Sequence, residues 1–338
     1  MTPPAQQAAP KVGPRAWDPR LIWAVLLMAA LLGLSGEHLL GPYWGLVLLT
    51  ALLHGALALS YDIMGGYGGE LNLGHGLFFG LGAYLSAIAL AAGLPAWAAL
   101  LFTAVGGLAL AALVCMLLVP LRGLLYAIAS LCLLLLMGLL ANNLVPVTGG
   151  PAGLSLRPQW GLQATLGAAG VLFLICWWVH ERFPRSRIGQ ALRACADDQL
   201  AAASAGVAVI RVRSQALMLG ALPAVMAGGL YPFHAAYVSP QSAFGMETAM
   251  APVVMVLVGG PGTRWGAVLG LVLLTALQEW LWVQGLQWRL SVWGVCLILS
   301  GVLLPRGLAG LMESVRPRFT TARSLRMKEI RELKDRPK

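Results

Sequence analysis

Charged side chains are scarce in this chain. Of its 338 residues, 11% are charged and 59% are hydrophobic, and the mean hydropathy is +0.77. A soluble domain carries about 25% charged residues, so a water-soluble globule of this length would lack the polar surface that it needs. The composition excludes most soluble enzymes, disordered chains and fibrous proteins, and it predicts a membrane protein.

Cysteine is also sparse, and catalytic or metal-binding motifs are missing from the sequence. The five cysteines are scattered without a CxxC pair, which is typical of small buried side chains. The glycine-rich run 259–266 lacks the Lys-Ser/Thr ending of a phosphate-binding loop and is typical of a tight turn. No HExxH or GxSxG motif occurs, and the five histidines are isolated from one another. We therefore expect no catalytic residue, metal or cofactor.

Long uncharged stretches predict the membrane-spanning helices. The longest covers 71–121, and because a spanning helix needs roughly 20 apolar residues, it holds two of them. The stretches are continuously apolar instead of alternating, so barrel strands are excluded. Turn signals divide them at 93–95, 120 and 148–151. The sequence predicts an all-α, polytopic membrane domain over 21–305 with about ten spans, at 21–36, 43–63, 76–93, 96–119, 123–144, 161–180, 214–231, 246–258, 265–283 and 290–305. The first and eighth are short enough to be tilted, broken or partly re-entrant.

The distribution of positive charge predicts the orientation. With a cytoplasmic N-terminus, the internal segments carry 21 of the 23 Lys and Arg residues, and only Arg157 and Arg289 fall outside. Basic residues concentrate on the cytoplasmic side of membrane proteins, so both termini are expected to be cytoplasmic. The internal segments are then 1–20, 64–75, 120–122, 181–213, 259–264 and 306–338.

The two ends of the chain differ in composition from the membrane domain. Segment 1–20 holds five prolines and three basic residues, and we expect a disordered cytoplasmic segment. No small-x-small cleavage site follows Leu34, so the first helix is expected to be retained and not removed as a signal peptide. The cytoplasmic tail 306–338 carries ten basic and four acidic residues. Such a basic tail is attracted to an anionic lipid surface. We therefore expect it to bind membrane lipids and not nucleic acid.

Few acidic residues lie near the predicted spans, and each is placed close to a span end. They are Asp62, Glu70, Glu247 and Glu279. An acid at mid-depth would mark an ion pathway. Glu279 comes nearest to that depth, although a helix-end residue that reaches the interface explains it better. An ion-coupled secondary carrier therefore stays open as an alternative.

Segment 64–84 is unusually rich in glycine at a predicted span boundary. Eight of its 21 residues are glycine, which favours close backbone approach or a broken helix, as transport pathways require. Asn72, Gly74 and His75 are the candidates for the translocation pathway. Ordinary helix packing explains the glycines equally well at this point.

The largest predicted cytoplasmic loop, 181–213, contains strong helix formers over 190–204 and a suitable helix stop at Gly206. A short helix that two spans present to the cytoplasm can dock a soluble partner. A solvated connector is the alternative, and the length, helicity and mixed charge of the loop favour docking.

At this loop the sequence resembles the permease subunits of bacterial ABC importers for branched-chain amino acids. Within that family it is similar to the LivM-type subunit, a group that also includes urea and short-amide importers. The resemblance extends over about 60–312 and rests on five motifs in order. They are Leu71-Asn72-Leu73-Gly74-His75-Gly76 with Phe78, Gly80 and Gly82-Ala83-Tyr84; Thr148-Gly149-Gly150-Pro151-x-Gly153; Arg185-Ser186-x-x-Gly189-x-x-Leu192-Arg193-Ala194 with Ala201 and Gly206; Val258-Gly259-Gly260-x-Gly262-x-x-x-Gly266; and Pro305-x-Gly307-Leu308-x-Gly310.

The resemblance implies a permease without bond chemistry in a bacterial inner membrane. Its implied partners are a second, LivH-type permease subunit, two cytoplasmic ATP-binding subunits and a periplasmic substrate-binding protein. The coupling loop would contact the ATPase through Arg193, Asp197, Asp198, Gln199, Ala201 and Gly206. Gln199 stands where the family usually has Glu, and Glu70-Leu71-Asn72 replaces a commoner apolar-Leu-Ser pattern. Urea or short amides stay open as substrates, and a polytopic membrane enzyme is a further alternative that lacks an active constellation.

Overall fold

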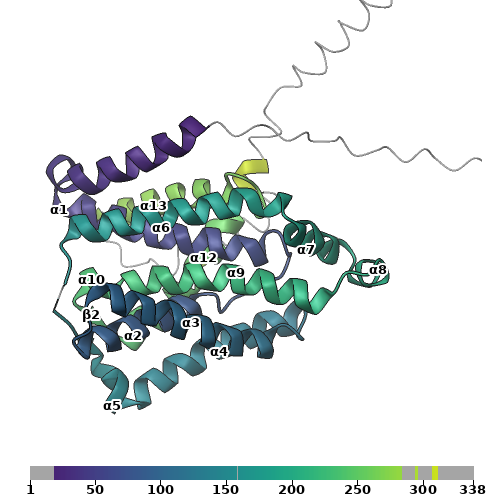
Figure 1. Cartoon of the computed structure of the whole chain (residues 1–338), viewed down its shortest axis with the longest axis horizontal. Helices are drawn as coiled ribbons and strands as arrows, with labels where there is room; N and C mark the ends of the chain where they lie inside the picture. Colours follow the sequence, from purple (N-terminus) through teal and green to yellow (C-terminus); the bar gives the residue numbers. More distant parts are fainter. Residues whose placement is uncertain (1–18, 158, 284–293, 296–306, 311–338) are drawn as a thin grey trace, which may run out of the picture.

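The described part of the chain is a bundle of helices (Figure 1). The computed structural model describes residues 19–157, 159–283, 294–295 and 307–310, and for 19–40 it describes the backbone alone. Its long helices are α1 (Pro19–Gly65), α2 (Gly76–Ala91), α3 (Ala96–Leu118), α4 (Gly123–Asn143), α6 (Leu162–Arg182), α9 (Val209–Leu230), α12 (Met246–Gly259) and α13 (Gly266–Val283). The all-α prediction is confirmed.

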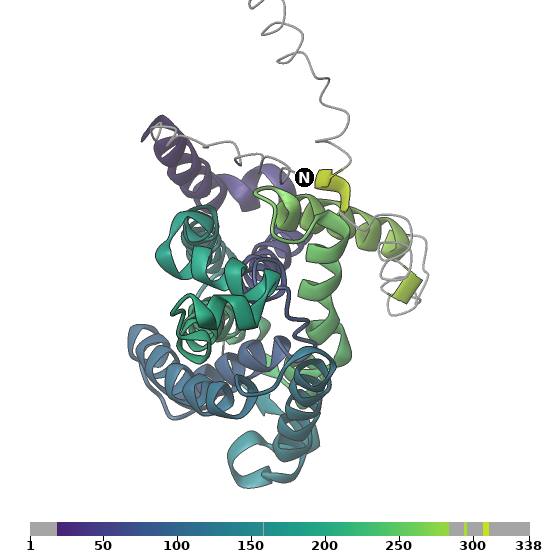
Figure 2. The same cartoon turned by 90° about the vertical axis from the view of Figure 1, so that its right-hand side faces the viewer.

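Short elements gather at the two ends of the bundle. One end, called here the β end, holds α5 (Val145–Thr148), η1 (Gly150–Ala152), β1 (Leu154–Ser155), α10 (Pro232–Ala235), β2 (Tyr237–Val238) and α11 (Pro240–Phe244). There β1 and β2 pair antiparallel, with Leu154 opposite Val238. The opposite end, called here the α7–α8 end, holds η2 (Phe183–Arg185), α7 (Arg187–Asp197) and α8 (Gln199–Ser204). Figure 2 views the molecule from the α7–α8 end, with the blue-purple part of α1 near the middle of the bundle.

Helix α1 contains the boundary between the first two predicted spans. Gly41 leaves the helical conformation at φ +74°, and Pro42 follows it. Glycine adopts positive φ without a steric penalty, and proline has no amide hydrogen to continue the helical ladder. Residues 19–40 and Gly41–Gly65 are therefore two helical segments, as the predicted division between 21–36 and 43–63 requires.

Six helices in the described residues are long and apolar enough to cross a membrane. They are Gly41–Gly65, Ala96–Leu118, Gly123–Asn143, Leu162–Arg185, Val209–Ala235 and Pro240–Gly259, and the shorter Gly76–Ala91 and Gly266–Leu281 are also apolar. The predicted span 290–305, the segment 1–20 and the tail 306–338 lie almost entirely outside the described residues. The total of ten spans therefore stays a prediction.

Loops predicted to lie on the same side of the membrane meet at the same end of the bundle. At the α7–α8 end, Arg213 pairs with Glu70 at 2.9 Å and donates to the carbonyl of Leu121 at 2.7 Å. The amide of Gly262 reaches the side chain of Asp62 at the same end. These contacts bring together the predicted internal segments 64–75, 120–122, 181–213 and 259–264, so the topology read from the charges is consistent with the fold.

The helices form an inner group and a lipid-facing group. About two thirds of the apolar window is buried in Gly41–Gly65 (61%) and Val209–Ala235 (67%), against 28% in α3, α4 and α6. Inside, α2 and α9 approach closely because Gly82 has no side chain. A Cβ added at Gly82 would lie 1.9 Å from the carbonyl oxygen of Val225. Such small residues let helix backbones touch in a membrane. The exposed faces of α3 and α4 are leucine-rich, as contact with lipid requires.

Candidate functional site

Loop 181–213 forms a helical projection at the α7–α8 end, where α8 extends farthest from the bundle (Figure 1). Helix α7 begins after Ser186, whose Oγ accepts a hydrogen bond from the Gly189 amide at 3.0 Å. Helix α8 begins after Asp198, whose Oδ1 accepts from the amides of Leu200 and Ala201 at 2.9 and 3.0 Å. Both residues are helix N-caps. The helix predicted within 190–204 is therefore two helices that meet at Asp198.

The projection is firmly seated on the bundle. Leu192 of α7 is 1% exposed, and α7 packs against α9. A Cβ added at Gly189 would lie 2.0 Å from the carbonyl oxygen of Phe183, so only glycine allows α7 to fold back onto η2. An added Cβ at Gly68 would lie 3.3 Å from Leu192, which brings the loop after α1 against the same helix. A displacement of α7 must therefore act on both α9 and the loop after α1.

All six residues predicted to contact the ATPase lie on this projection. Five of them are exposed and Gln199 is half-buried, the exposed ones being Arg193, Asp197, Asp198, Ala201 and Gly206. Gly206 has a φ of +89° and follows the end of α8. Asp198 caps α8 with one carboxylate oxygen. The structure places these side chains where a soluble partner can reach them, and their contacts with that partner stay a prediction.

Two exposed apolar side chains accompany the predicted residues. Leu200 of α8 is 78% exposed and Ile210 of α9 is 63% exposed. Both line a groove of about 580 Å³ between α8 and the start of α9, together with Arg122 and Gln199. Leu200 and Ile210 were not singled out from the sequence, because exposure is invisible in a run of apolar residues.

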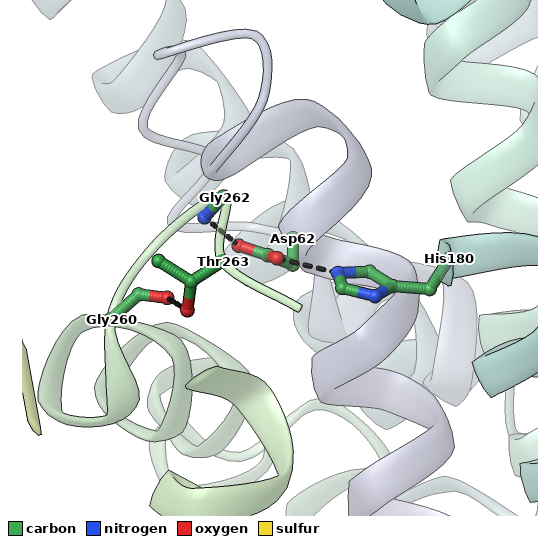
Figure 3. A network of polar contacts seen from close by, with 5 residues as sticks. All are labelled: Asp62, His180, Gly260, Gly262 and Thr263. Carbon is green, nitrogen blue, oxygen red and sulfur yellow. Dashed lines mark hydrogen bonds and ion pairs between the residues drawn. The ribbon is translucent and has the colours of Figure 1, made fainter. Parts of the chain in front are cut away.

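A buried polar junction lies beneath the projection (Figure 3). Asp62 of α1 and His180 of α6 are both completely buried, and Nε2 of His180 lies 2.6 Å from Oδ2 of Asp62. The other carboxylate oxygen accepts a hydrogen bond from the amide of Gly262 at 2.9 Å. Thr263 donates to the carbonyl of Gly260 at 2.7 Å and closes the turn. Asp62 therefore ties α1 to α6 and to the turn between α12 and α13.

Tyr67 connects the projection to this junction. Its ring centroid lies 5.3 Å from that of His180 and 5.7 Å from that of Phe183. The guanidinium of Arg193, on α7, lies 4.8 Å from the centroid of the Tyr67 ring, within the range of a cation–π contact. A second contact joins the turn between α12 and α13 to α6, because Arg264 forms an ion pair with Glu181 in the last turn of that helix. The turn is thus linked to α6 through Glu181 and to α1 through Asp62.

Asn72, Gly74 and His75 lie in the irregular segment between α1 and α2. Asn72 and Gly74 contact α4, and His75 contacts α1. The Gly74 amide donates to Oγ of Ser130 at 3.2 Å, and an added Cβ at Gly74 would lie 1.9 Å from the Ser130 carbonyl oxygen. Asn72 is 1% exposed and donates to the hydroxyl of Tyr126, and His75 is completely buried. The irregular segment separates α1 from α2, and Gly74 packs closely against α4, which agrees with the helix-packing interpretation of the glycines. A role in the translocation pathway stays a prediction.

Arg213 of α9 holds this segment and the end of α3 in place. Its side chain is 3% exposed, pairs with Glu70 at 2.9 Å and donates to the carbonyls of Val119 and Leu121, each at 2.7 Å. Burial raises the pKa of Glu70, and Arg213 counteracts that shift. The unusual Glu70 of the sequence therefore has a structural partner.

Asp62 and Glu247 lie near helix ends, as the sequence predicted. Asp62 lies near the end of α1 but is 0% exposed. Glu247 begins α12 as predicted, yet the first turn of α12 faces the middle of α1 inside the bundle, where both border one cavity with His54. The prediction that Glu247 lies near the end of a span agrees with the bounds of α12, Met246–Gly259. No cluster of three or more metal-ligating side chains occurs among the described residues.

Residues 44–301 match the family described as "Branched-chain amino acid transport system / permease component". The chain belongs to this permease family. The permease is 27% identical over 284 residues to the high-affinity branched-chain amino acid transport system permease proteins LivM of Salmonella typhimurium and Escherichia coli. These alignments cover 75% of the permease and 66% of each relative, so the permease spans slightly less than two thirds of their length.

A further relative is similar over a shorter stretch. The autoinducer 2 import system permease protein LsrC of Klebsiella pneumoniae is 32% identical over 166 residues, which is 46% of the permease and 44% of that protein. No solved structure matches the permease. Family membership and the six apolar helices identify a multi-pass protein of the inner membrane.

Proposed function

We propose that the permease is one membrane subunit of an ABC importer for branched-chain, hydrophobic amino acids. It receives substrate from a periplasmic binding protein, pairs with a second, LivH-type permease subunit and is driven by two cytoplasmic ATP-binding subunits. Two relatives that align with 75% of the chain are named for branched-chain amino acid transport. The permease itself performs no bond chemistry in this scheme.

The projection of α7 and α8 is the observation that carries the proposal. It is exposed, helical and seated on the bundle, and it presents both charged and apolar side chains. An amphipathic helix of this kind fits a groove in a soluble partner. The ATPase contact would be formed by Arg193, Asp197, Asp198, Gln199, Ala201 and Gly206, with Leu200 as an added apolar anchor.

Alternating access follows if the projection moves with its partner. ATP-bound and free ATPases must differ in their affinity for the two pore conformations, because a ligand shifts an equilibrium only through differential binding. Arg193 contacts Tyr67, Tyr67 contacts His180, and Asp62 binds the turn before α13. Motion of α7 is thereby passed to α12 and α13, while Asn72, Gly74 and His75 shape the pathway beside them.

Purification of the tagged permease from its native membrane in mild detergent tests the assembly. The proposal expects a second permease and two ATP-binding subunits to co-purify. As a matched pair, Leu200→Asp should lose the ATP-binding subunits and retain the second permease, whereas Leu94→Asp, an exposed leucine near the β end, should retain both. A permease that purifies alone under conditions that preserve its fold would contradict the proposal.

A further inference from the structure

The groove between α8 and the start of α9 combines an apolar lining with positive charge. Its volume of about 580 Å³ lies within the roughly 300–1,000 Å³ range of small-molecule sites. Arg122, Gln199 and Arg211 are its polar lining residues, and none of the described residues that line it is acidic. The apolar lining residues are Leu200, Ala203, Val207, Ala208, Val209 and Ile210. An amphiphile with an anionic head matches this combination.

The two arginines come from different helices, and the fold holds those helices together. Arg122 directly precedes α4, and Arg211 lies in the first turn of α9. Two residues farther along α9, the guanidinium of Arg213 donates to the carbonyls of Val119 and Leu121, each at 2.7 Å. The residues just before Arg122 are thereby fixed against α9. Two cations therefore share one groove although they repel each other.

Neither Arg122 nor Arg211 forms an ion pair with another described residue. Glu70 attracts Arg122 electrostatically, but its carboxylate is paired with Arg213 at 2.9 Å. The first turns of α4 and α9 contain no acidic residue. The positive ends of two helix dipoles therefore add to the charge of the guanidinium groups. Positive charge at this groove exceeds negative charge, and a bound anion would neutralise it.

The groove lies where the chain enters the membrane. Gly123–Asn143 and Val209–Ala235 are both long and apolar enough to span it, so the two arginines lie at the predicted cytoplasmic boundary of two spans. Next to them, Leu124, Leu125 and Ile210 are 76%, 68% and 63% exposed. The cations are therefore at the level of lipid headgroups, and an apolar surface continues from them into the membrane.

We propose that this groove binds an anionic phospholipid of the cytoplasmic leaflet. Arg122 and Arg211 hold the phosphate, and one acyl chain lies against Ile210 and the exposed leucines at the start of α4. Basic pockets between spanning helices on the cytoplasmic side bind acidic lipid headgroups in this way. Inorganic phosphate or an acidic protein surface would use the arginines and leave the membrane-facing apolar surface without a role. Lipid binding here does not depend on which solute is transported.

The bound lipid would support the projection from below. Ala202 is the buried residue of α8, so few side chains fasten this helix to the bundle. A headgroup in the groove contacts α8 on one side and the start of α9 on the other. Leu200, 78% exposed, lies at the rim and stays accessible to a soluble partner. Since a ligand that binds the folded chain stabilises it, the lipid is expected to raise the unfolding midpoint of the permease.

The double variant Arg122→Gln with Arg211→Gln tests the site in the full-length permease, purified in mild detergent with the subunits that accompany it. Arg185→Gln with Arg187→Gln is the matched control, because both arginines are exposed at the same end and lie outside the groove. Binding of fluorescent phosphatidylglycerol is titrated, with phosphatidylethanolamine as the lipid without net charge. The basic tail 306–338 is present in every variant, so differences between variants report the groove. Unfolding midpoints with and without phosphatidylglycerol give a second measurement.

A basic residue next to an anionic lipid contributes about fivefold in affinity. The double glutamine variant is therefore expected to bind phosphatidylglycerol at least tenfold more weakly, and the control to change by less than twofold. Replacement of both groove arginines by lysine should restore most of the affinity. Phosphatidylglycerol should raise the unfolding midpoint of the wild type and not that of the double glutamine variant.

Three results would overturn the lipid site. The first is wild-type affinity of the double glutamine variant for phosphatidylglycerol. The second is equally tight binding of phosphatidylethanolamine, or displacement of the lipid by inorganic phosphate, because either would show that the groove does not select an anionic lipid. The third is loss of ATP-binding subunits from the double glutamine variant with lipid binding unchanged, which would assign the groove to the soluble partner.

Discussion

His180 and Asp62 form a completely buried pair, with Nε2 of the histidine 2.6 Å from Oδ2 of the aspartate. The pair joins the inner ends of two spanning helices, and the second oxygen of Asp62 extends the contact to the Gly262 amide. Buried polar groups are costly unless each finds a partner. These hydrogen bonds therefore hold α1, α6 and the turn before α13 together, so that the three elements are expected to move as a unit.

Breaking this pair should uncouple ATP hydrolysis from transport. Asp62→Asn keeps the shape but removes the charge, and its amide cannot accept from both His180 and Gly262 with the same strength. We expect leucine-stimulated ATPase activity of the complex to fall at least fivefold while the subunits still co-purify. Glu279→Gln removes a carboxylate away from both the junction and the projection and serves as the charge-matched comparison. Normal stimulation in Asp62→Asn would show that the junction does not transmit the motion.

Tyr67 should matter for the same reason, through its ring and not its hydroxyl. The ring lies between Arg193 and His180. Tyr67→Phe preserves the ring and should retain coupling within about twofold, because a cation–π contact depends on the aromatic face. Tyr67→Leu should reduce stimulated ATPase activity several-fold. Equal activity of the two variants would remove Tyr67 from the proposed connection.

The end of α8 should be sensitive to backbone geometry. Gly206 has a φ of +89°, which proline cannot adopt because its ring holds φ near −65°. Gly206→Pro, or deletion of 195–204, is expected to abolish coupling and to leave membrane insertion intact. Insertion is measured by membrane fractionation and coupling by substrate-dependent ATPase activity of the assembled complex. Unchanged ATPase stimulation would contradict the role of the projection.

Arg213 should be required for the stability of the fold more than for transport. Arg213→Met leaves Glu70 without its cation and the carbonyls of Val119 and Leu121 without their donor. Loss of one partner of a buried pair costs about 3 kcal/mol, so the thermal unfolding midpoint in detergent should fall clearly. The double variant Glu70→Gln with Arg213→Met should recover part of that loss. No recovery would mean that the carbonyl contacts, and not the ion pair, dominate.

The helical architecture could be predicted because a membrane restricts the chain to few solutions. Continuous apolar runs predict helices in lipid, and the predicted turn signals at 93–95 and 120 and the glycine turn at 259–266 fall between helices of the structure. The positive charges predicted which loops share one side, and the contacts of Arg213 agree with that topology. One helix was predicted within 190–204, and the break at Asp198 was not.

The buried contacts could not be predicted because apolar runs do not show which face turns inward. His180 and Asp62 both lie at the inner ends of predicted spans, so the predicted topology placed them at the same depth. Their spacing in the sequence did not predict that they contact each other. No role was predicted for His54, because an isolated histidine in a spanning helix usually packs in the core without a function. Glu247 was placed at a span end, which agrees with the bounds of α12, but its position across one cavity from His54 was not predicted.

The most direct test of the central claim is uptake of labelled leucine by proteoliposomes that contain the co-purified complex, with the binding protein outside and nucleotide inside. The account predicts uptake with ATP, and none with a non-hydrolysable analogue or without the binding protein. Uptake by the purified chain alone, without ATP, would contradict the account and would identify a secondary carrier.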